Sequence, residues 1–170
     1  MKKIVKYFLI SVLIGGSCYA DPIKIQMIER ISQFIQWPIQ IENYFIIGVY
    51  KNPKITSLMQ ESYKDKLINN LPIKIINIDS FNDVKNSNVN LIYFTQELNK
   101  DLELFLKEFK TEPILVITDY PDDIYNEHIH LALYFSEQKI KFSVNQTALD
   151  NTNLKASYQL LKLAKIVKSN

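Results

Sequence analysis

The stretch Tyr44–Tyr50 reads YFIIGVY and is apolar along almost its whole length. A strand that is apolar on both faces is typical of the centre of a parallel sheet, where helices cover both sides. The run Pro53–Tyr63 follows and has a helical pattern. Three further strand-like runs come after it, at Pro72–Ile78, Val89–Phe94 and Pro113–Thr118. We expect these four runs, of which Pro72–Ile78 alternates between apolar and polar residues, to be the parallel strands of one sheet.

Helical and hairpin patterns surround this centre. Asp21-Pro22 is a good helix start, and Trp37-Pro38 marks the expected end of the first helix, because the residue before a proline disfavours helical backbone. Two later strand-like runs are separated by only four residues, which permits a hairpin and no crossover helix. The other expected elements are a short helix at Phe81–Lys85, a helix at Glu97–Phe109, hairpin strands at Ile129–Phe135 and Ile140–Val144, and a last helix that opens at Asn153 and buries Leu154, Ser157, Leu160, Leu161, Ala164 and Val167.

Together these patterns predict an α/β fold of three layers. A mostly parallel sheet is flanked by helices, with a C-terminal antiparallel hairpin strand pair and a final packed helix. No internal repeat and no linker interrupts the pattern, so we expect residues 21–170 to form a single domain.

The first twenty residues have the pattern of a bacterial secretory signal. Met1-Lys2-Lys3 is basic, Tyr7–Ile14 is apolar, and Cys18-Tyr19-Ala20 puts small residues at the positions that a signal peptidase reads. We therefore expect residues 1–20 to be a signal peptide that is cleaved before Asp21, leaving the protein in the periplasm. No later apolar run approaches the ~20 residues that are needed to span a bilayer, so the mature chain is not itself expected to be transmembrane.

Cleavage would also change the net charge of the protein and remove its only thiol. The chain has 20 basic and 18 acidic side chains, and three of the lysines lie in the signal, so the rest is near-neutral. Nucleic-acid binding needs a clustered basic face, and we expect none here. Cys18 is the only cysteine, so the mature chain would have no disulfide, no thiol catalysis and no cysteine zinc site. A lipid on Cys18 is the weaker alternative, because Gly15 stands where a lipidation signal usually has leucine.

Catalytic motifs are missing from the rest of the sequence. Gly48 is the only glycine after the signal, so neither a dinucleotide fingerprint nor a phosphate-binding loop can be built. The nucleophile elbow of the α/β hydrolases also needs flanking glycines. We expect no cofactor and no enzymatic activity.

One weak metal constellation remains. His128 and His130 would project from the same face of a strand, and acidic side chains precede them. Two imidazoles and a carboxylate are a plausible zinc or nickel set, which would suit a metal-dependent hydrolase. The alternative, which we favour, is a polar edge strand after an acidic loop. The acidic residues concerned are Asp119, Asp122, Asp123 and Glu127.

Two carboxylates and two aromatic residues are further candidates for binding. Asp79 and Asp119 each follow a predicted parallel strand, and strand carboxyl ends line the ligand crevice of an open α/β sheet. The alternative is that each caps a turn or a helix. Trp37, the only tryptophan, is expected to pack under the first helix, or to anchor an interface together with Phe34.

Two segments resemble the YfiR family. Phe142-Ser143-Val144-Asn145 ends a strand, and Leu154–Ala164 then carries Leu154, Ser157, Leu160, Leu161 and Ala164 in the family's pattern L-x-x-S-x-x-L-L-x-L-A. The helix that ends at Trp37-Pro38, followed by the strand Phe45–Val49, is similar to the family's opening. Apart from the family, Asn145 can bond backbone groups in the turn after its strand, and Ser157 is small enough to let a helix approach the sheet.

The resemblance implies a secreted, non-catalytic regulator. Proteins of this family sit in the periplasm, are described as dimers, and repress an inner-membrane diguanylate cyclase by binding its periplasmic sensor region, which lowers cyclic-di-GMP and biofilm formation. The redox-tuned disulfides of the best-known branch have no counterpart in a mature chain without cysteine. Two other classes of function stay open. One is a periplasmic small-molecule-binding module that uses Asp79 and Asp119, and the other is the metal-dependent hydrolase with His128 and His130.

Overall fold

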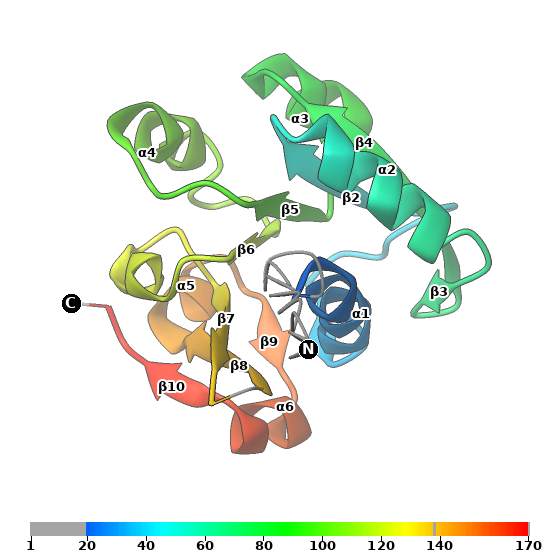
Figure 1. Ribbon diagram of the computed structural model, residues 1–170. Helices are drawn as coiled ribbons and strands as arrows, with labels where there is room; N and C mark the ends of the chain where they lie inside the picture. Colours follow the sequence, from blue (N-terminus) through cyan, green and yellow to red (C-terminus); the bar gives the residue numbers. More distant parts are fainter. Residues whose placement is uncertain (1–19, 138, 170) are drawn as a thin grey trace, which may run out of the picture.

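The computed structural model describes residues 20–137 and 139–169, in which a curled sheet carries helices on both faces (Figure 1). The expected signal peptide, with Cys18, lies outside the described residues except for Ala20. The strands are β1 (Ile35–Gln36), β2 (Phe45–Tyr50), β3 (Leu67–Ile68), β4 (Leu71–Ile78), β5 (Leu91–Phe94), β6 (Leu115–Thr118), β7 (Leu131–Ser136), β8 (Lys139–Asn145), β9 (Lys155–Ala156) and β10 (Lys165–Val167). The helices are α1 (Ala20–Ser32), α2 (Pro53–Ser62), α3 (Phe81–Ser87), α4 (Lys100–Lys107), the 3₁₀ helix η1 (Pro121–Tyr125), α5 (Gln146–Asn151) and α6 (Tyr158–Leu163).

The sheet is mostly parallel, in the order β10-β8-β7-β6-β5-β2-β4-β3. Strand β2 lies parallel between β4 and β5, and β6 and β7 continue the parallel run. Strands β7 and β8 form the predicted antiparallel hairpin, and β10 adds to the outer side of β8 in parallel. The predicted fold class is confirmed, and the sheet extends one strand beyond the hairpin.

The two faces of the sheet bury separate apolar clusters, which gives three layers. One cluster lies under α1 and α2, where Ile28 and Met59 pack against Ile47 of the sheet. The other lies under α3 and α4, where Val84 and Leu102 are fully buried. In Figure 1 the sheet curls around α1, which lies on the inner side of the curve. No helix among the described residues is long and apolar enough to cross a membrane.

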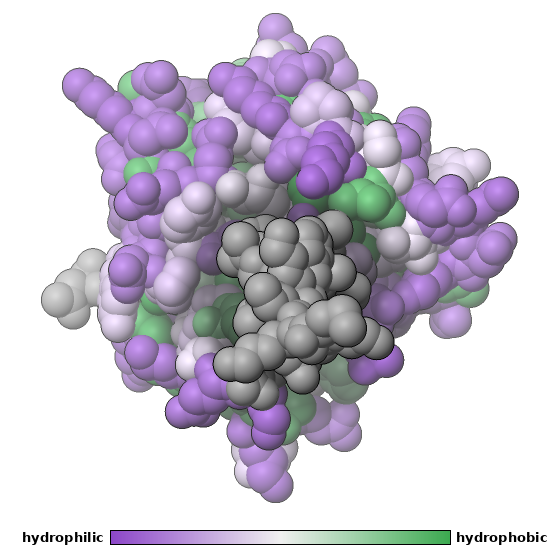
Figure 2. All heavy atoms as spheres, in the orientation of Figure 1, coloured by the Kyte–Doolittle hydropathy of each residue, from purple (hydrophilic) through white to green (hydrophobic). Residues whose placement is uncertain are grey.

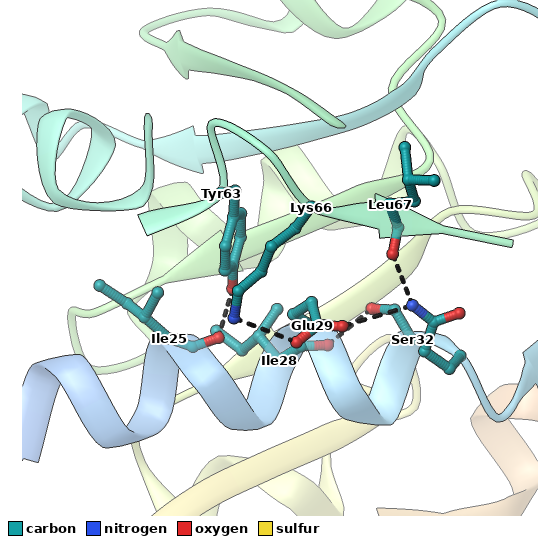
Figure 3. A network of polar contacts seen from close by, with 8 residues as sticks. Ile25, Ile28, Glu29, Ser32, Tyr63, Lys66 and Leu67 are labelled. Carbon is teal, nitrogen blue, oxygen red and sulfur yellow. Dashed lines mark hydrogen bonds and ion pairs between the residues drawn. The ribbon is translucent and has the colours of Figure 1, made fainter. Parts of the chain in front are cut away.

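A polar network fastens α1 to the segment that joins α2 to the sheet (Figure 3). The buried Tyr63 hydroxyl donates to the carbonyl of Ile25. Lys66 Nζ lies 3.4 Å from Glu29 Oε2, and Gln33 Nε2 donates to the carbonyl of Leu67 at 2.6 Å. Burial is the main cause that raises the pKa of Tyr63 far above its ordinary value, so this hydroxyl stays a proton donor. The first helix is therefore held along its length and is part of the core.

The first helix ends earlier than the sequence predicts. Helix α1 stops at Ser32, whose hydroxyl bonds back to the Ile28 carbonyl at 2.8 Å, and not at Trp37. Ile35–Gln36 instead forms strand β1, which pairs antiparallel with β9. A partner strand more than a hundred residues away thus decides this boundary, and the local helical pattern does not reveal it.

The expected last helix from Asn153 is also wrong in its extent. Only Tyr158–Leu163 is helical, because Lys155–Ala156 pairs with β1 and Lys165–Val167 pairs with β8. Without β10, the outer backbone groups of Ser143–Asn145 would lack strand partners. Of the expected stripe, Leu160 and Leu161 lie on α6 and Val167 lies on β10, while Leu154, Ser157 and Ala164 lie in the residues between helices and strands.

Candidate functional site

The two carboxylates that follow parallel strands do not share a site. Asp79 follows β4 and Asp119 follows β6, and strands β2 and β5 lie between them. Three strand spacings separate the two strand ends by about 14 Å. Asp79 is exposed and accepts a hydrogen bond from Asn77 Nδ2 at 2.9 Å.

Asp119 is covered by the first helix and takes part in a buried polar triad. Lys24 Nζ lies 3.0 Å from Asp119 Oδ2, and the two side chains are 13% and 12% exposed. The Tyr93 hydroxyl donates to Asp119 Oδ1 at 2.7 Å. Burial raises the pKa of Asp119, while the Tyr93 hydrogen bond and Lys24 act against the rise. Burial, followed by the Asp119 charge, also raises the pKa of the Tyr93 phenol. The triad ties α1 to strands β5 and β6, and it leaves the carboxylate little freedom to bind a ligand.

The strand order reverses between β2 and β5, which is where open α/β sheets usually bind ligands. Here Asn52 Oδ1 accepts from the Ile55 amide at 3.1 Å and caps α2, while its Nδ2 donates to Thr95 Oγ1 at 2.7 Å. Sequence reasoning missed this pair, although Asn52-Pro53 is a standard helix start and could have identified the cap. At the place where the strand order reverses, the Asn52 side chain is therefore already hydrogen-bonded within the protein.

His130 is 2% exposed, and both of its ring nitrogens are engaged. Nδ1 accepts from the Val116 amide at 3.0 Å, so Nε2 carries the proton and donates to Thr152 Oγ1, also at 3.0 Å. Burial lowers the pKa of His130 to about 3. The ring therefore stays neutral and joins β6 to the end of α5, with no lone pair left for a metal.

His128 lies in the turn before β7 and His130 is the residue directly before this strand, so neither histidine lies on the strand that the sequence predicts. Its Nε2 is 3.4 Å from Glu127 Oε1 and makes no hydrogen bond among the described residues. Burial lowers the pKa of His128 as well. Of the acidic loop, Asp122 is exposed, and Asp123 Oδ2 accepts from the Leu98 amide at 3.0 Å. Over residues 20–137 and 139–169, no group of three or more histidine, cysteine or acidic side chains is arranged to hold a metal.

The asparagine of the family motif is a buried connector. Asn145, at the end of β8, donates from Nδ2 to the carbonyls of Ile124 and Asn126 at 2.9 and 3.1 Å. Its Oδ1 accepts from the Ala148 amide at 3.2 Å and caps α5. One side chain thus holds η1 and α5 against β8, beside Phe142, which is buried in the same strand.

The rest of the C-terminal motif also has structural contacts. Ser157 caps α6, because its hydroxyl accepts from the Leu160 amide at 3.3 Å, which differs from the expected role as a small spacer. Leu154 and Leu160 are buried in the cluster under α1. Leu161 and Ala164 are only partly buried against it.

Phe34 and Trp37 lie differently from each other. Trp37 packs edge-on against Phe45 with ring centroids 5.0 Å apart, and its Nε1 donates to the Asn90 carbonyl at 3.4 Å. It is half-buried and packs against the apolar cluster under α1 and α2, and Pro38 after it is exposed. Phe34 is 39% exposed, although its carbonyl accepts from the Ser157 amide at 2.9 Å. Phe34 is thus an apolar side chain on a fixed backbone that faces solvent.

Two shallow grooves lie beside the segment that follows Trp37. One of about 610 Å³ runs from Ile39 and Tyr44 to Phe109 and Ile114, at the amino ends of the parallel strands. The other, of about 700 Å³, is lined by Trp37 itself and Ile39. Neither groove is lined by Asp79 or Asp119, so the hollowed surface and the predicted crevice are at different places.

Comparison with known proteins agrees with the motif. A family model described as YfiR/HmsC-like matches residues 21–165. A solved structure, a conserved domain protein from Vibrio cholerae, is 12% identical and superposes with a TM-score of 0.56, over 88% of this chain and 60% of that one. At this identity the likeness concerns the fold alone. The comparison with curated proteins gives no match. The family model covers nearly all of the described residues, and the chain belongs to the YfiR/HmsC-like family.

Proposed function

We propose that this chain is an exported regulator that binds the periplasmic domain of a membrane-bound signalling enzyme, a diguanylate cyclase, and represses it. The observation that carries the proposal is the family match over residues 21–165. Members of this family act as periplasmic regulators of such cyclases. On this proposal, the protein lowers cyclic-di-GMP by contact with the enzyme and catalyses nothing itself.

Export is part of the proposal. The signal pattern of residues 1–20 supports cleavage before Asp21, and the family match begins at the same residue. The expected single domain, residues 21–170, would then begin at the new N-terminus.

The polar side chains best suited to catalysis make contacts inside the fold, which is consistent with a non-catalytic regulator. The groups best suited to chemistry, His130 and Asp119, are engaged by hydrogen bonds or an ion pair inside the fold. Catalysis needs such groups to face a substrate. These side chains instead stabilise the junctions between helices and sheet.

We assign the contact with the cyclase to the face that carries Phe34 and the segment after Trp37. Phe34, Ile39 and Tyr44 are exposed there, at 39%, 57% and 50% of their surface. The two grooves beside Ile39 give this face a concave relief. A protein interface buries about 1,200–2,000 Å², and a few anchors of this kind carry most of its energy. The same face would serve a homodimer, which makes dimerisation and partner binding competing uses of one surface.

A pull-down tests the proposal. The bait is mature protein, residues 21–170, added to detergent-solubilised membranes of the native host. Wild type should capture a diguanylate cyclase, identified by mass spectrometry, and Phe34→Asp should lose it. Leu104→Asp is the matched control, because Leu104 is 56% exposed on α4, on the other side of the sheet. Capture of the cyclase by all three proteins would remove Phe34 from the interface, and no cyclase with any of them would contradict the regulator proposal.

A further inference from the structure

The charge of this protein is distributed unevenly along the chain. Residues 21–150 contain 13 basic and 18 acidic side chains, whereas residues 151–170 contain four lysines and no acidic side chain. The four are Lys155, Lys162, Lys165 and Lys168. Lys162 lies on α6, Lys165 on the edge strand β10 and Lys168 in the residue after it, so these three lie along one edge of the sheet, whereas Lys155 lies on β9, which pairs with β1 in a separate two-stranded sheet.

These lysines are exposed and uncompensated. None of them takes part in an ion pair within the part of the chain that the structure describes. On the neighbouring hairpin, Glu137 is already paired with Lys141. Asp150 of α5 is the other acidic side chain on the adjoining elements. A net positive field therefore covers this edge.

Large apolar side chains stand between the lysines. Tyr158 and Leu163 are each 78% exposed, and Ile166 is 42% exposed. At 100° per residue, Tyr158 and Lys162 each lie about 160° around α6 from the buried Leu160 and project outward, whereas Leu163 lies about 60° from Leu160 and is exposed at the last residue of the helix. Figure 2 shows hydrophilic surface with hydrophobic patches at the lower end of the molecule, where α6 lies in Figure 1.

We propose that the outer edge of the sheet, with Tyr158, Lys162 and Leu163 on α6 and Lys165 and Ile166 projecting to either side of the edge strand β10, is a docking face for the surface of an anionic phospholipid bilayer. The lysines would attract the headgroups, and each lysine near such a surface strengthens binding about fivefold. Tyrosine and leucine side chains that protrude from a folded domain can enter the headgroup region, where amphipathic aromatic rings are favoured.

The composition of the face distinguishes a bilayer from a protein partner. The cores of protein interfaces are depleted in lysine, because its long, strongly hydrated side chain is costly to order and desolvate. A lipid surface lets each ammonium group stay hydrated while the apolar side chains insert. Alternating lysine and exposed apolar residues, without acidic side chains in the segment, fit the bilayer better. The inference does not depend on which enzyme the protein regulates.

Vesicle sedimentation tests the proposal with mature wild-type protein. Vesicles that contain 30% phosphatidylglycerol in phosphatidylcholine should bind the protein, and pure phosphatidylcholine vesicles should not. Binding should fall steeply as NaCl rises to about 0.5 M, because salt screens charges at an exposed surface. Equal binding to both kinds of vesicle, or none to either, would overturn the proposal.

Two double variants test whether this face is the part of the protein that binds the vesicles. Lys162→Gln with Lys165→Gln should weaken binding roughly 25-fold, at about fivefold per lysine. Tyr158→Ser with Leu163→Ser should lose retention at high lipid concentration. All four side chains are exposed, so the variants should fold and melt as the wild type does.

The matched control is Lys100→Gln with Leu104→Ser, two exposed positions of α4, and it should bind as wild type does. If the lysine variant binds vesicles as well as wild type, the bilayer proposal is wrong. If wild type ignores protein-free vesicles and the lysine variant instead fails to capture the cyclase, this face is a protein interface and the bilayer proposal is also wrong. Loss of vesicle binding with intact cyclase capture would separate this face from that of Phe34.

Discussion

The neutral, buried His130 predicts how stability depends on pH. Its pKa in the folded protein is about 3, against 6.5 in an unfolded chain. Between these values the unfolded chain binds a proton that the folded protein does not bind. The free energy of unfolding is therefore highest above pH 6.5 and falls as the pH falls from 6.5 towards 3.

The size of the effect follows from the same pKa values. Each pH unit in this window is worth about 1.4 kcal/mol, so acidification from pH 7.5 to 5.0 should cost the wild type ~2 kcal/mol through His130 alone. For a domain of this size, that corresponds to a fall in Tm of about 4–8 °C. His130→Gln removes the titrating ring and can keep an acceptor or a donor in its place.

The assay is urea denaturation at the two pH values, for wild type and His130→Gln. The variant is expected to be less stable at pH 7.5, because two buried hydrogen bonds are altered, but to lose about 2 kcal/mol less on acidification. Other titrating groups, including Asp119, contribute equally to both proteins and cancel. The control is His128→Gln, which should keep the loss that is due to His130. Equal losses of stability for wild type and His130→Gln would show that His130 already takes up a proton in the folded protein, which would refute the prediction. If the variant does not fold, the ring NMR shifts of His130 in the wild type serve instead. A change in these shifts between pH 8 and 5 would also show that the folded protein binds the proton.

Three further outcomes are expected. Gly48→Ala should destabilise by about 1–3 kcal/mol in denaturant melts, because an added Cβ would lie 1.9 Å from Ile78 Cδ1, and an unchanged midpoint would show that Ile78 moves aside freely. Lys24→Met should cost about 3–5 kcal/mol at pH 7, because it leaves the buried Asp119 carboxylate without its cation. That deficit should shrink as the pH falls, since the folded pKa of Asp119 is already raised and would rise further, and a pH-independent deficit would mean that Lys24 contributes packing only. Mass spectrometry of protein from the native host should give Asp21 as the first residue, and any other N-terminus would contradict the cleavage prediction.

The sheet could be predicted from the sequence because its strands are coded locally. The runs at 44–50, 89–94 and 113–118 are apolar enough to be strands buried on both faces and contain β2, β5 and β6, while the alternating run at 72–78 lies within β4. The C-terminal segment could not be read in this way. Leu154–Ala164 has helical spacing, but the ends of that segment find strand partners in β1 and β8, and only tertiary pairing decides between the two.

In the candidate site, too, the positions of the residues along the chain could be predicted, whereas their tertiary contacts could not. The position of Asp119 after a strand was readable, but its pairing with Lys24 depends on how α1 crosses the sheet. The histidine spacing suggested a strand with both rings on one face, whereas His128 lies in a turn and His130 directly precedes β7. Exposure of Phe34 depends on the early end of α1, which the sequence pattern does not show.

Cyclic-di-GMP measured in the native host tests the regulator proposal most directly. Deletion of the gene should raise cyclic-di-GMP and surface attachment, and wild-type protein or Leu104→Asp supplied in trans should restore the low level. Phe34→Asp, exported in equal amount, should fail to restore it. Unchanged cyclic-di-GMP on deletion, in a host whose cyclase is expressed, would contradict the proposal that this protein represses that enzyme.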